Sequence, residues 1–246
     1  MSGATVPTGG GARGGGAVPG RPEPARAGAA AGRPCVAAPD RGQGRHRFTD
    51  NGAMTMRVVS LNVPRPPGSP GPLRLEPATG PVAVGLAGLA RQAPGHPVGE
   101  DPALADELAL SHALYAYPTL HAPVWQTLRA QAGVAAPDAP LPPGAFDEHL
   151  SLDGVQESLL WAGDLLRFPD CTLVVSVPRL PDARFNETLG FVQAARMVAQ
   201  SRWSGFWLSV RVPGSLAAGQ PFELVPGPRH TSVVELFRAR TAKMVW

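Results

Sequence analysis

The chain is poor in lysine, cysteine and tyrosine. Among its 246 residues, lysine occurs only at Lys243, cysteine only at Cys35 and Cys171, and there are two tyrosines. Two cysteines, one of them in a Gly- and Pro-rich stretch, do not form the disulfide framework of a small secreted domain. Because arginine supplies almost all of the positive charge, an isolated arginine carries little functional information here.

Long apolar runs are also missing from the sequence. No stretch approaches the roughly 18 apolar residues that a membrane-spanning helix requires. The N-terminal region contains arginines but lacks the apolar segment of a secretory signal. We therefore expect a cytoplasmic protein in a reducing environment, without membrane association.

The small positive charge of the chain is unevenly distributed. Residues 1–53 contain seven arginines against three acidic residues, which gives +4, so the remainder of the +3 chain sums to −1. A nucleic-acid-binding domain is expected to carry its cations on a folded face. We therefore do not expect the folded part to bind nucleic acid, although binding through the basic tail stays open as an alternative.

The composition divides the chain into three segments. Residues 1–53 consist largely of Gly, Ala, Pro and Arg, and such a stretch buries too little apolar surface to offset its ordering entropy. We predict a disordered tail at 1–53, a folded domain at 54–240 and a C-terminal end at 241–246. Because Met54 and Met56 directly precede a predicted strand, we also hypothesise that translation starts at one of them.

Short β-rich runs dominate after Met56, separated by Pro and Gly turns. Strands are predicted at 58–63, 82–86, 159–160, 172–177, 206–212 and 222–225. Apolar residues at helical spacing predict helices at 119–131 and 187–201, and the Ala- and Pro-rich stretch 132–144 is interpreted as a loop. This pattern predicts an α+β domain that is β-rich and barrel-like, with a few helices.

Four segments, taken in order and spacing, resemble the MOSC domain family, the C-terminal domain type of molybdenum-cofactor sulfurases. The resemblance is greatest to the family's bacterial stand-alone branch, which is related to hydroxylaminopurine reductases. The segments are MRVVSLNV at 56–63, ALYAYP at 113–118 with His121 and Trp125 after it, LPPGAFDEHL at 141–150, and VVSVPRLP at 174–181.

The resemblance implies a β-rich MOSC fold and a pocket for the pterin-molybdenum cofactor. It also implies binding of molybdenum ion or pyridoxal phosphate, and an oxidoreductase activity on N-hydroxylated compounds that draws electrons from a partner reductase. A second interpretation stays open, in which the chain is a catalytically degenerate binding or interaction module with the same fold.

The chain departs from the family where the chemistry is expected. The family cysteine follows Pro-Arg-x-Pro, and Asp182 occupies that position here. A thiolate is soft and can carry a sulfane sulfur, whereas a carboxylate is a hard oxygen donor that cannot. A family lysine near the start corresponds to Leu75, with Arg74 beside it. Asp182 therefore argues against sulfur transfer at this position.

Six residues are candidates for the site that the resemblance implies. Asp182 and His149 are the candidate catalytic residues, the first as an oxygen ligand or proton-transfer group and the second as a titratable pocket residue. The candidates for cofactor binding are Arg179, Arg184 and Arg202, because guanidinium groups suit phosphate, and Glu148, because a carboxylate can orient His149. The alternatives are a solvated carboxylate at Asp182, and for Arg179 a structural salt bridge with Glu148 or Asp164.

Overall fold

A computed structural model describes residues 55–66, 68–69, 74–90, 110–134 and 140–244. The chain divides into two units, Met1–Thr49 and Asp50–Trp246, and the description below concerns the second. The predicted disorder of 1–53, the proposed translation start at Met54 and residues 135–139 of the predicted loop lie outside the described residues. Among the described residues, no helix has the length and apolar character needed to cross a membrane.

The unit is built on one large sheet. Its strands run in the order β11-β7-β8-β9-β5-β6-β1-β2, and a smaller sheet has the order β10-β3-β4. Among the described strands, only β5 and β6 pair in parallel, and the other neighbouring strands are antiparallel. The strands are β1 (Arg57–Pro64), β2 (Leu75–Pro77), β3 (Val82–Gly85), β4 (Gly88–Leu89), β5 (Leu114–Pro118), β6 (Leu150–Asp153), β7 (Leu165–Arg167), β8 (Thr172–Pro178), β9 (Phe206–Val212), β10 (Gly214–Leu216) and β11 (Glu223–Val225).

The large sheet curves strongly without closing. Just before β11, the chain passes beside β1, where Phe222 N donates to Met56 O at 3.0 Å and Val58 N donates to Gln220 O at 3.0 Å. These bonds bring the two ends of the strand order close together. The edge strands β2 and β11 nevertheless do not pair with each other in the described part of the chain. The predicted barrel-like α+β fold is thus confirmed as a curved, open sheet with helices.

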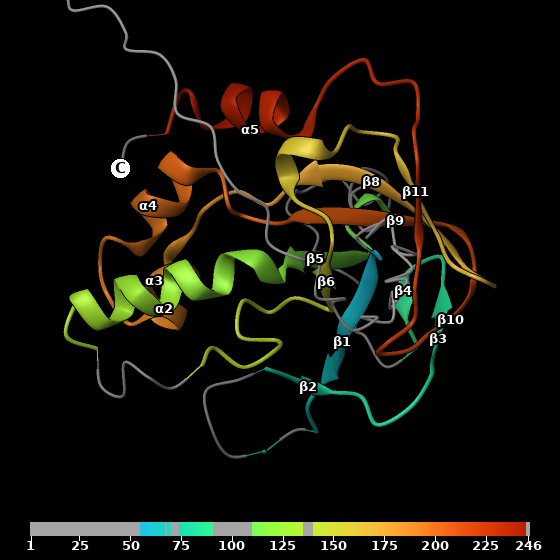
Figure 1. The fold of residues 1–246 in the computed structure, drawn as a ribbon, viewed down its shortest axis with the longest axis horizontal. Helices are drawn as coiled ribbons and strands as arrows, with labels where there is room; N and C mark the ends of the chain where they lie inside the picture. The colour runs from blue at the N-terminus through green and yellow to red at the C-terminus, as the bar shows by residue number, and fades with distance from the viewer. Residues whose placement is uncertain (1–54, 67, 70–73, 91–109, 135–139, 245–246) are drawn as a thin grey trace, which may run out of the picture. The chain divides into compact units, whose positions relative to one another are not determined.

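The helices cover two parts of this sheet. They are η1 (Thr119–His121), α2 (Ala122–Gln131), η2 (Glu157–Leu159), α3 (Ala183–Leu189), α4 (Ala194–Ser201) and α5 (Val233–Thr241). In Figure 1, α2, α3 and α4 gather on the left and α5 lies above, against β8. Helix α5 begins with a capping box, in which the Ser232 side chain accepts from Glu235 N and the Glu235 side chain accepts from Ser232 N.

Two hydrophobic clusters hold the unit together. The larger lies on the sheet and includes Val58, Leu61, Leu150 and Leu208, all fully buried. The smaller joins the sheet to the helices and is rich in aromatic residues: Tyr115, Tyr117, Trp125, Phe146, Phe185, Leu189, Ala194, Ala195 and Val198. The aromatic cluster anchors α3, and with it the segment that holds Asp182.

Most predicted elements are confirmed, and two are corrected. The strands at 58–63, 82–86, 172–177, 206–212 and 222–225 and the helix at 119–131 are present with small changes of boundary. The predicted strand 159–160 is wrong, because residues Glu157–Leu159 form a 3-10 turn. The predicted helix 187–201 is two helices, since Gly190 adopts a left-handed φ of 81° and ends α3.

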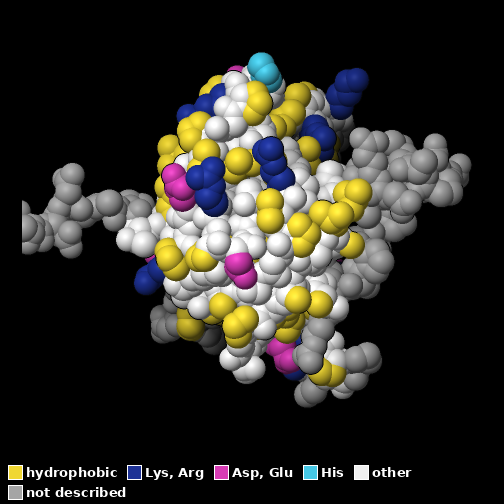
Figure 2. Space-filling model, turned by 90° about the vertical axis from the view of Figure 1, so that its right-hand side faces the viewer, with side chains coloured by type: hydrophobic (Ala, Val, Ile, Leu, Met, Phe, Trp, Pro, Cys, Tyr) yellow, Lys and Arg dark blue, Asp and Glu magenta, His cyan; other side chains and the backbone are white. Residues whose placement is uncertain are grey.

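The surface on the β3, β10 and β11 side is chemically mixed. Figure 2 shows basic, acidic and hydrophobic side chains interspersed across this face rather than gathered into one basic surface. The face shown therefore offers no continuous track of cations of the kind that a nucleic-acid backbone requires.

Candidate functional site

The candidate site begins where β8 ends. The strand stops at Pro178, and the residues up to Pro181 lead into α3. Asp182 is the N-cap of this helix, and its side chain accepts a hydrogen bond from Arg184 N at 3.0 Å. An N-cap carboxylate satisfies a free backbone N–H and favours the positive end of the helix. The residue in the family cysteine position therefore has a structural task in this chain.

Arg179 is a largely enclosed charge at this end of β8. Its side chain is 11% exposed, and its guanidinium lies 4.9 Å from the centre of the Tyr115 ring and 4.7 Å from that of Phe185. One terminal nitrogen donates to Phe146 O, and the other lies 3.2 Å from Asp182 Oδ2. Burial acts to lower the pKa of Arg179, but Tyr115 and Asp182 outweigh it and raise that pKa, so the side chain stays charged.

Asp147 connects the loop before β6 to α3. This residue has a left-handed φ of 61°, and its carboxylate receives Arg184 Nε at 2.9 Å and Nη2 at 3.3 Å. Arg184 also contacts Glu187 at 2.9 Å, while Arg74 lies 3.9 Å from Asp147. We call Arg74, Asp147, Arg179, Asp182, Arg184 and Glu187 the arginine–carboxylate cluster. Its three cations face three carboxylates, so the cluster is close to neutral.

Glu148 holds the loop that carries Asp147. It is 3% exposed and accepts from Gly144 N at 2.7 Å, Phe146 N at 3.0 Å and Ser151 Oγ at 2.8 Å. Burial raises the pKa of Glu148, and these hydrogen bonds oppose the rise. Its partners are thus loop and strand groups, and the alternative in which Glu148 pairs with Arg179 is wrong: Arg179 pairs with Asp182.

His149 lies directly behind the cluster. It is 8% exposed, and its Nδ1 accepts from Tyr115 N at 3.0 Å. Burial lowers the pKa of His149 to about 4, although the charge of Asp147 opposes this shift. The imidazole is therefore neutral near pH 7, and it is attached to the same tyrosine whose ring lies under Arg179.

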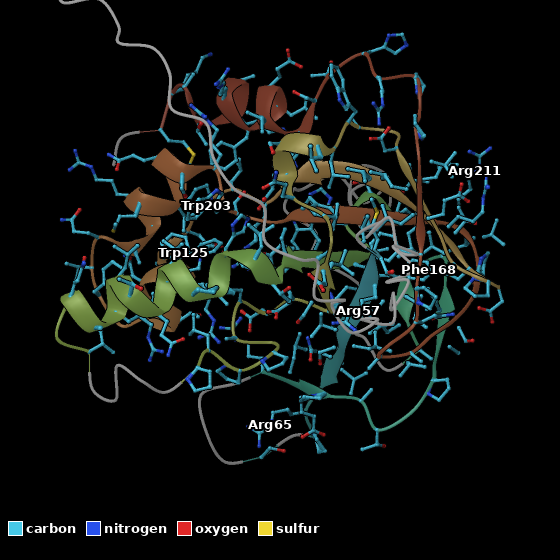
Figure 3. All side chains as sticks on the ribbon, in the orientation of Figure 1. Arg57, Arg65, Trp125, Phe168, Trp203 and Arg211 are labelled. Carbon is cyan, nitrogen blue, oxygen red and sulfur yellow. The ribbon has the colours of Figure 1, made fainter. Side chains whose placement is uncertain are left out.

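A second polar network, which was not predicted from the sequence, begins at two members of the aromatic cluster and reaches the η2 turn. Trp125 Nε1 donates to Tyr117 Oη at 2.7 Å, and Tyr117 Oη donates to Trp203 O at 3.1 Å. His121 Nε2 lies 2.8 Å from Glu157 Oε2, and the other oxygen of Glu157 accepts from Gly205 N at 2.9 Å. Figure 3 shows Trp125 and Trp203 together on the α2 and α4 side.

Cys171 lies at the opposite end of β8 from Asp182. It is 1% exposed and directly precedes the strand. Burial raises the pKa of the Cys171 thiol to about 11. A buried, protonated thiol at the far end of the strand cannot replace the family cysteine.

Arg202 is placed apart from the other candidates. It ends α4 in a left-handed conformation and lines a cleft with Trp203 and Arg238. No contact in the described ranges joins it to Arg179, Asp182 or Arg184. Of the six candidates, the structure thus brings together Asp182, Arg179 and Arg184, places Glu148 and His149 immediately behind them, and separates Arg202.

The comparisons with known proteins can now be set against this geometry. The family profile of the MOSC domain matches residues 99–223. The chain belongs to the MOSC domain family. It is 34% identical over 91 residues to Protein YiiM of Escherichia coli and 28% identical over 113 residues to the uncharacterized protein YflK of Bacillus subtilis. Of the four segments that carried the resemblance, 56–63 lies on β1, 113–118 on β5, 141–150 in the loop that leads into β6, and 174–181 on β8 and the residues after it.

Solved structures support the MOSC fold over a longer stretch. YiiM from Geobacillus stearothermophilus superposes with a TM-score of 0.57 and 25% identity, covering 75% of this chain and 83% of that one. YiiM from Escherichia coli gives a TM-score of 0.54 at 22% identity, covering 78% and 79%. In sequence, however, the matched regions span only 41% and 48% of the two curated relatives.

Proposed function

We propose that this chain is a MOSC-fold binding module for a small anionic, phosphate-bearing ligand, and that it does not carry sulfur. The observation that supports the proposal is the double use of Asp182. In the family cysteine position, this carboxylate caps α3 through Arg184 N and pairs with the enclosed Arg179 at 3.2 Å.

The first part of the proposal, loss of sulfur transfer, follows from donor chemistry. Sulfur transfer needs a thiolate that can form a persulfide, and a carboxylate cannot hold a sulfane sulfur. Cys171 is buried at the other end of β8, with its thiol protonated near neutral pH. Within the described residues, no other thiol is available to the arginine–carboxylate cluster.

The cofactors that the family implies fit this cluster incompletely. The molybdenum of the pterin cofactor would meet the hard carboxylate of Asp182 rather than a soft thiolate, and no group of three metal-ligating side chains is found among the described residues. Pyridoxal phosphate would need a lysine for a Schiff base, and the one lysine of the chain, Lys243, follows α5. We therefore derive no reaction step through either group.

The second part of the proposal, anion binding, rests on how the two partners of the Arg179–Asp182 pair are held. Arg179 is fixed between two aromatic rings and bonded to Phe146 O, whereas the side chain of Asp182 is 52% exposed. An incoming phosphate oxygen can take the place of Asp182 on the guanidinium, while Asp182 keeps its bond to the helix N-terminus. Guanidinium groups bind phosphate oxygens strongly and with defined geometry.

The test titrates the full chain with inorganic phosphate at low ionic strength and measures the binding by isothermal calorimetry. We expect Asp182→Asn to bind phosphate roughly tenfold more tightly than the parent protein, because asparagine still caps the helix but no longer competes as an anion. Arg167→Gln is the matched control, since Arg167 belongs to an exposed pair with Glu223 at 3.2 Å far from the cluster.

Two outcomes would contradict the anion-binding proposal. One is an equal phosphate affinity for Asp182→Asn and the parent protein. The other is a loss of affinity in the control Arg167→Gln, since binding would then be a general surface effect. Circular dichroism of each variant checks that the cluster substitutions leave the fold intact.

A second candidate function is a cofactor-dependent reduction of N-hydroxylated compounds, with electrons supplied by a partner reductase. The observation that favours it is the neutral His149, bonded through Nδ1 to Tyr115 N behind the cluster, where an imidazole could exchange a proton with a substrate. Its test is reduction of hydroxylaminopurine by the full chain with a chemical electron donor. Activity that is present in the parent protein and lost in His149→Gln supports this candidate. Absence of activity in both proteins rejects it.

A further inference from the structure

A second cleft lies away from the arginine–carboxylate cluster. It is formed between the η2 turn, the end of α4 and α5, and has a volume of about 290 Å³. Its lining residues are Gln156, Glu157, Ser158, Ser201, Arg202, Trp203, Val234 and Arg238. This volume is at the lower end of the range for small-molecule sites, and the lining combines a flat aromatic ring with two cations.

Trp203 gives this cleft a rigid aromatic wall. One face of its indole stacks on His121, with ring centres 4.6 Å apart and planes 13° apart, and its edge meets Trp125 at 5.8 Å. Its backbone is fixed as well, because Tyr117 Oη donates to its carbonyl and its N–H donates to Ser201 Oγ. The indole therefore does not need to be ordered when a planar ring packs against it.

The two arginines of the cleft have no ion pair in the part of the chain that the structure describes. Arg202 ends α4 with a φ of 65°, and Arg238 lies in the last turn of α5. The nearby Glu235 shares three hydrogen bonds of the capping box with Ser232, and the charge of Arg238 acts on it without an ion-pair contact. These guanidinium groups contrast with those of the arginine–carboxylate cluster, where Arg179 and Arg184 each have a carboxylate partner.

The carboxylate at the floor of the cleft does not oppose an anion strongly. Glu157 is 3% exposed, and one of its oxygens is bonded to His121 Nε2 and the other to Gly205 N. Both oxygens are thus directed into the protein. Ser158 at the rim is exposed and available as a hydrogen-bond donor.

We propose that this cleft binds a planar aromatic phosphate of the size of a nucleoside monophosphate. The ring packs on Trp203, and the phosphate lies between Arg202 and Arg238. The site is distinct from the arginine–carboxylate cluster and does not depend on its function. Two arginines with a stacking ring form the combination that holds a phosphate and a base at once.

The experiment titrates the full chain with adenosine 5′-monophosphate, and compares adenosine and ribose 5-phosphate, by isothermal calorimetry at low salt. We expect the monophosphate to bind at least tenfold more tightly than either fragment, because each fragment keeps only one of the two contacts. Arg202→Asn and Arg238→Gln should each weaken binding about tenfold, as expected for losing one charged hydrogen bond. Asparagine is chosen at 202 because it accepts the left-handed backbone conformation.

Matched controls separate this site from the cluster. Arg240→Gln, on the same last turn of α5 but outside the lining of the cleft, should leave the affinity for adenosine 5′-monophosphate unchanged. Asp182→Asn should leave unchanged the difference in affinity between the monophosphate and ribose 5-phosphate, because both ligands carry the phosphate that the cluster could bind. The proposal is overturned if Arg202→Asn and Arg238→Gln bind like the parent protein, or if that difference changes in Asp182→Asn instead. Equal affinity for adenosine and adenosine 5′-monophosphate would show that the phosphate does not contribute to binding.

Discussion

The two ends of β8 differ in the chemistry that they present. At one end, Cys171 is a buried thiol whose pKa is raised to about 11. At the other end, Arg179 and Asp182 form a charged pair at the start of α3, in the position where the MOSC family has its cysteine. The fold can therefore keep its scaffold while the reactive group at a key position is replaced by one that serves helix capping and charge pairing.

The largest expected effect comes from removing Arg179 at the Asp182 end. Arg179→Ala should lower the free energy of unfolding by about 3 to 4 kcal/mol, because it empties the space between two rings and leaves Phe146 O without its donor. Arg167→Ala, at the Cys171 end of the neighbouring strand, removes an exposed pair and should cost under about 1 kcal/mol. Urea unfolding of both variants tests this difference. If Arg179→Ala and Arg167→Ala lost the same free energy of unfolding, the two ends of β8 would not differ in this respect.

The next effect is a pH dependence that His149 confers. Its pKa is near 6.5 in the unfolded chain and about 4 in the folded protein, so the unfolded state binds the proton first. The contribution of His149 to the free energy of unfolding is fully present above pH 6.5 and is lost as the pH falls to about 4. This contribution amounts to roughly 3 kcal/mol. Urea unfolding at pH 7 and pH 4.5 should show a smaller pH-dependent loss in His149→Gln than in the parent protein.

The thiol at the far end of β8 offers a kinetic comparison. A thiol with a pKa of about 11 instead of 9.0 has about a hundredfold less thiolate at pH 8, so Cys171 should react at least that much more slowly with iodoacetamide than a cysteine placed by Asp182→Cys. Peptide mapping by mass spectrometry measures each site separately. Rapid labelling of Cys171 in the folded protein would mean that this end of the strand is open.

The smallest expected effect concerns the cap itself. Asp182→Ala should destabilise the protein by about 1 kcal/mol, whereas Asp182→Asn should change stability by only a few tenths, because asparagine also accepts from Arg184 N. Thermal unfolding of the two variants checks this order. A neutral effect of alanine would show that α3 does not depend on the cap.

The sequence predicted the fold better than the site. Strands β1, β8 and β9 were found because they are long enough to show a β pattern, whereas β5 was missed because all five of its residues are buried and give no alternation. The break in the helix at 187–201 depended on Gly190, whose left-handed φ is a matter of local packing as well as residue type. The α5 helix carried a readable signal, Ser232 followed three residues later by Glu235.

For the site, chain spacing predicted the neighbours within one segment but not the partners from other segments. Arg179, Asp182 and Arg184 belong to one stretch, and their grouping followed from it. Asp147, which binds Arg184, comes from a different loop and was not proposed, and Arg202 lies apart from the other candidates because nothing in the sequence fixes where α4 ends in space. Such long-range contacts are set by the packing of the aromatic cluster.

The most direct test of the account is the molybdenum and pterin content of the full chain, purified from a host that makes the cofactor. With Asp182 in place of the thiolate, we predict a folded protein with neither molybdenum nor pterin, measured by inductively coupled plasma mass spectrometry and by fluorescence of the oxidised pterin. Near-stoichiometric molybdenum with pterin in the parent protein would contradict the account, because it would mean that a carboxylate can take over the position of the family cysteine.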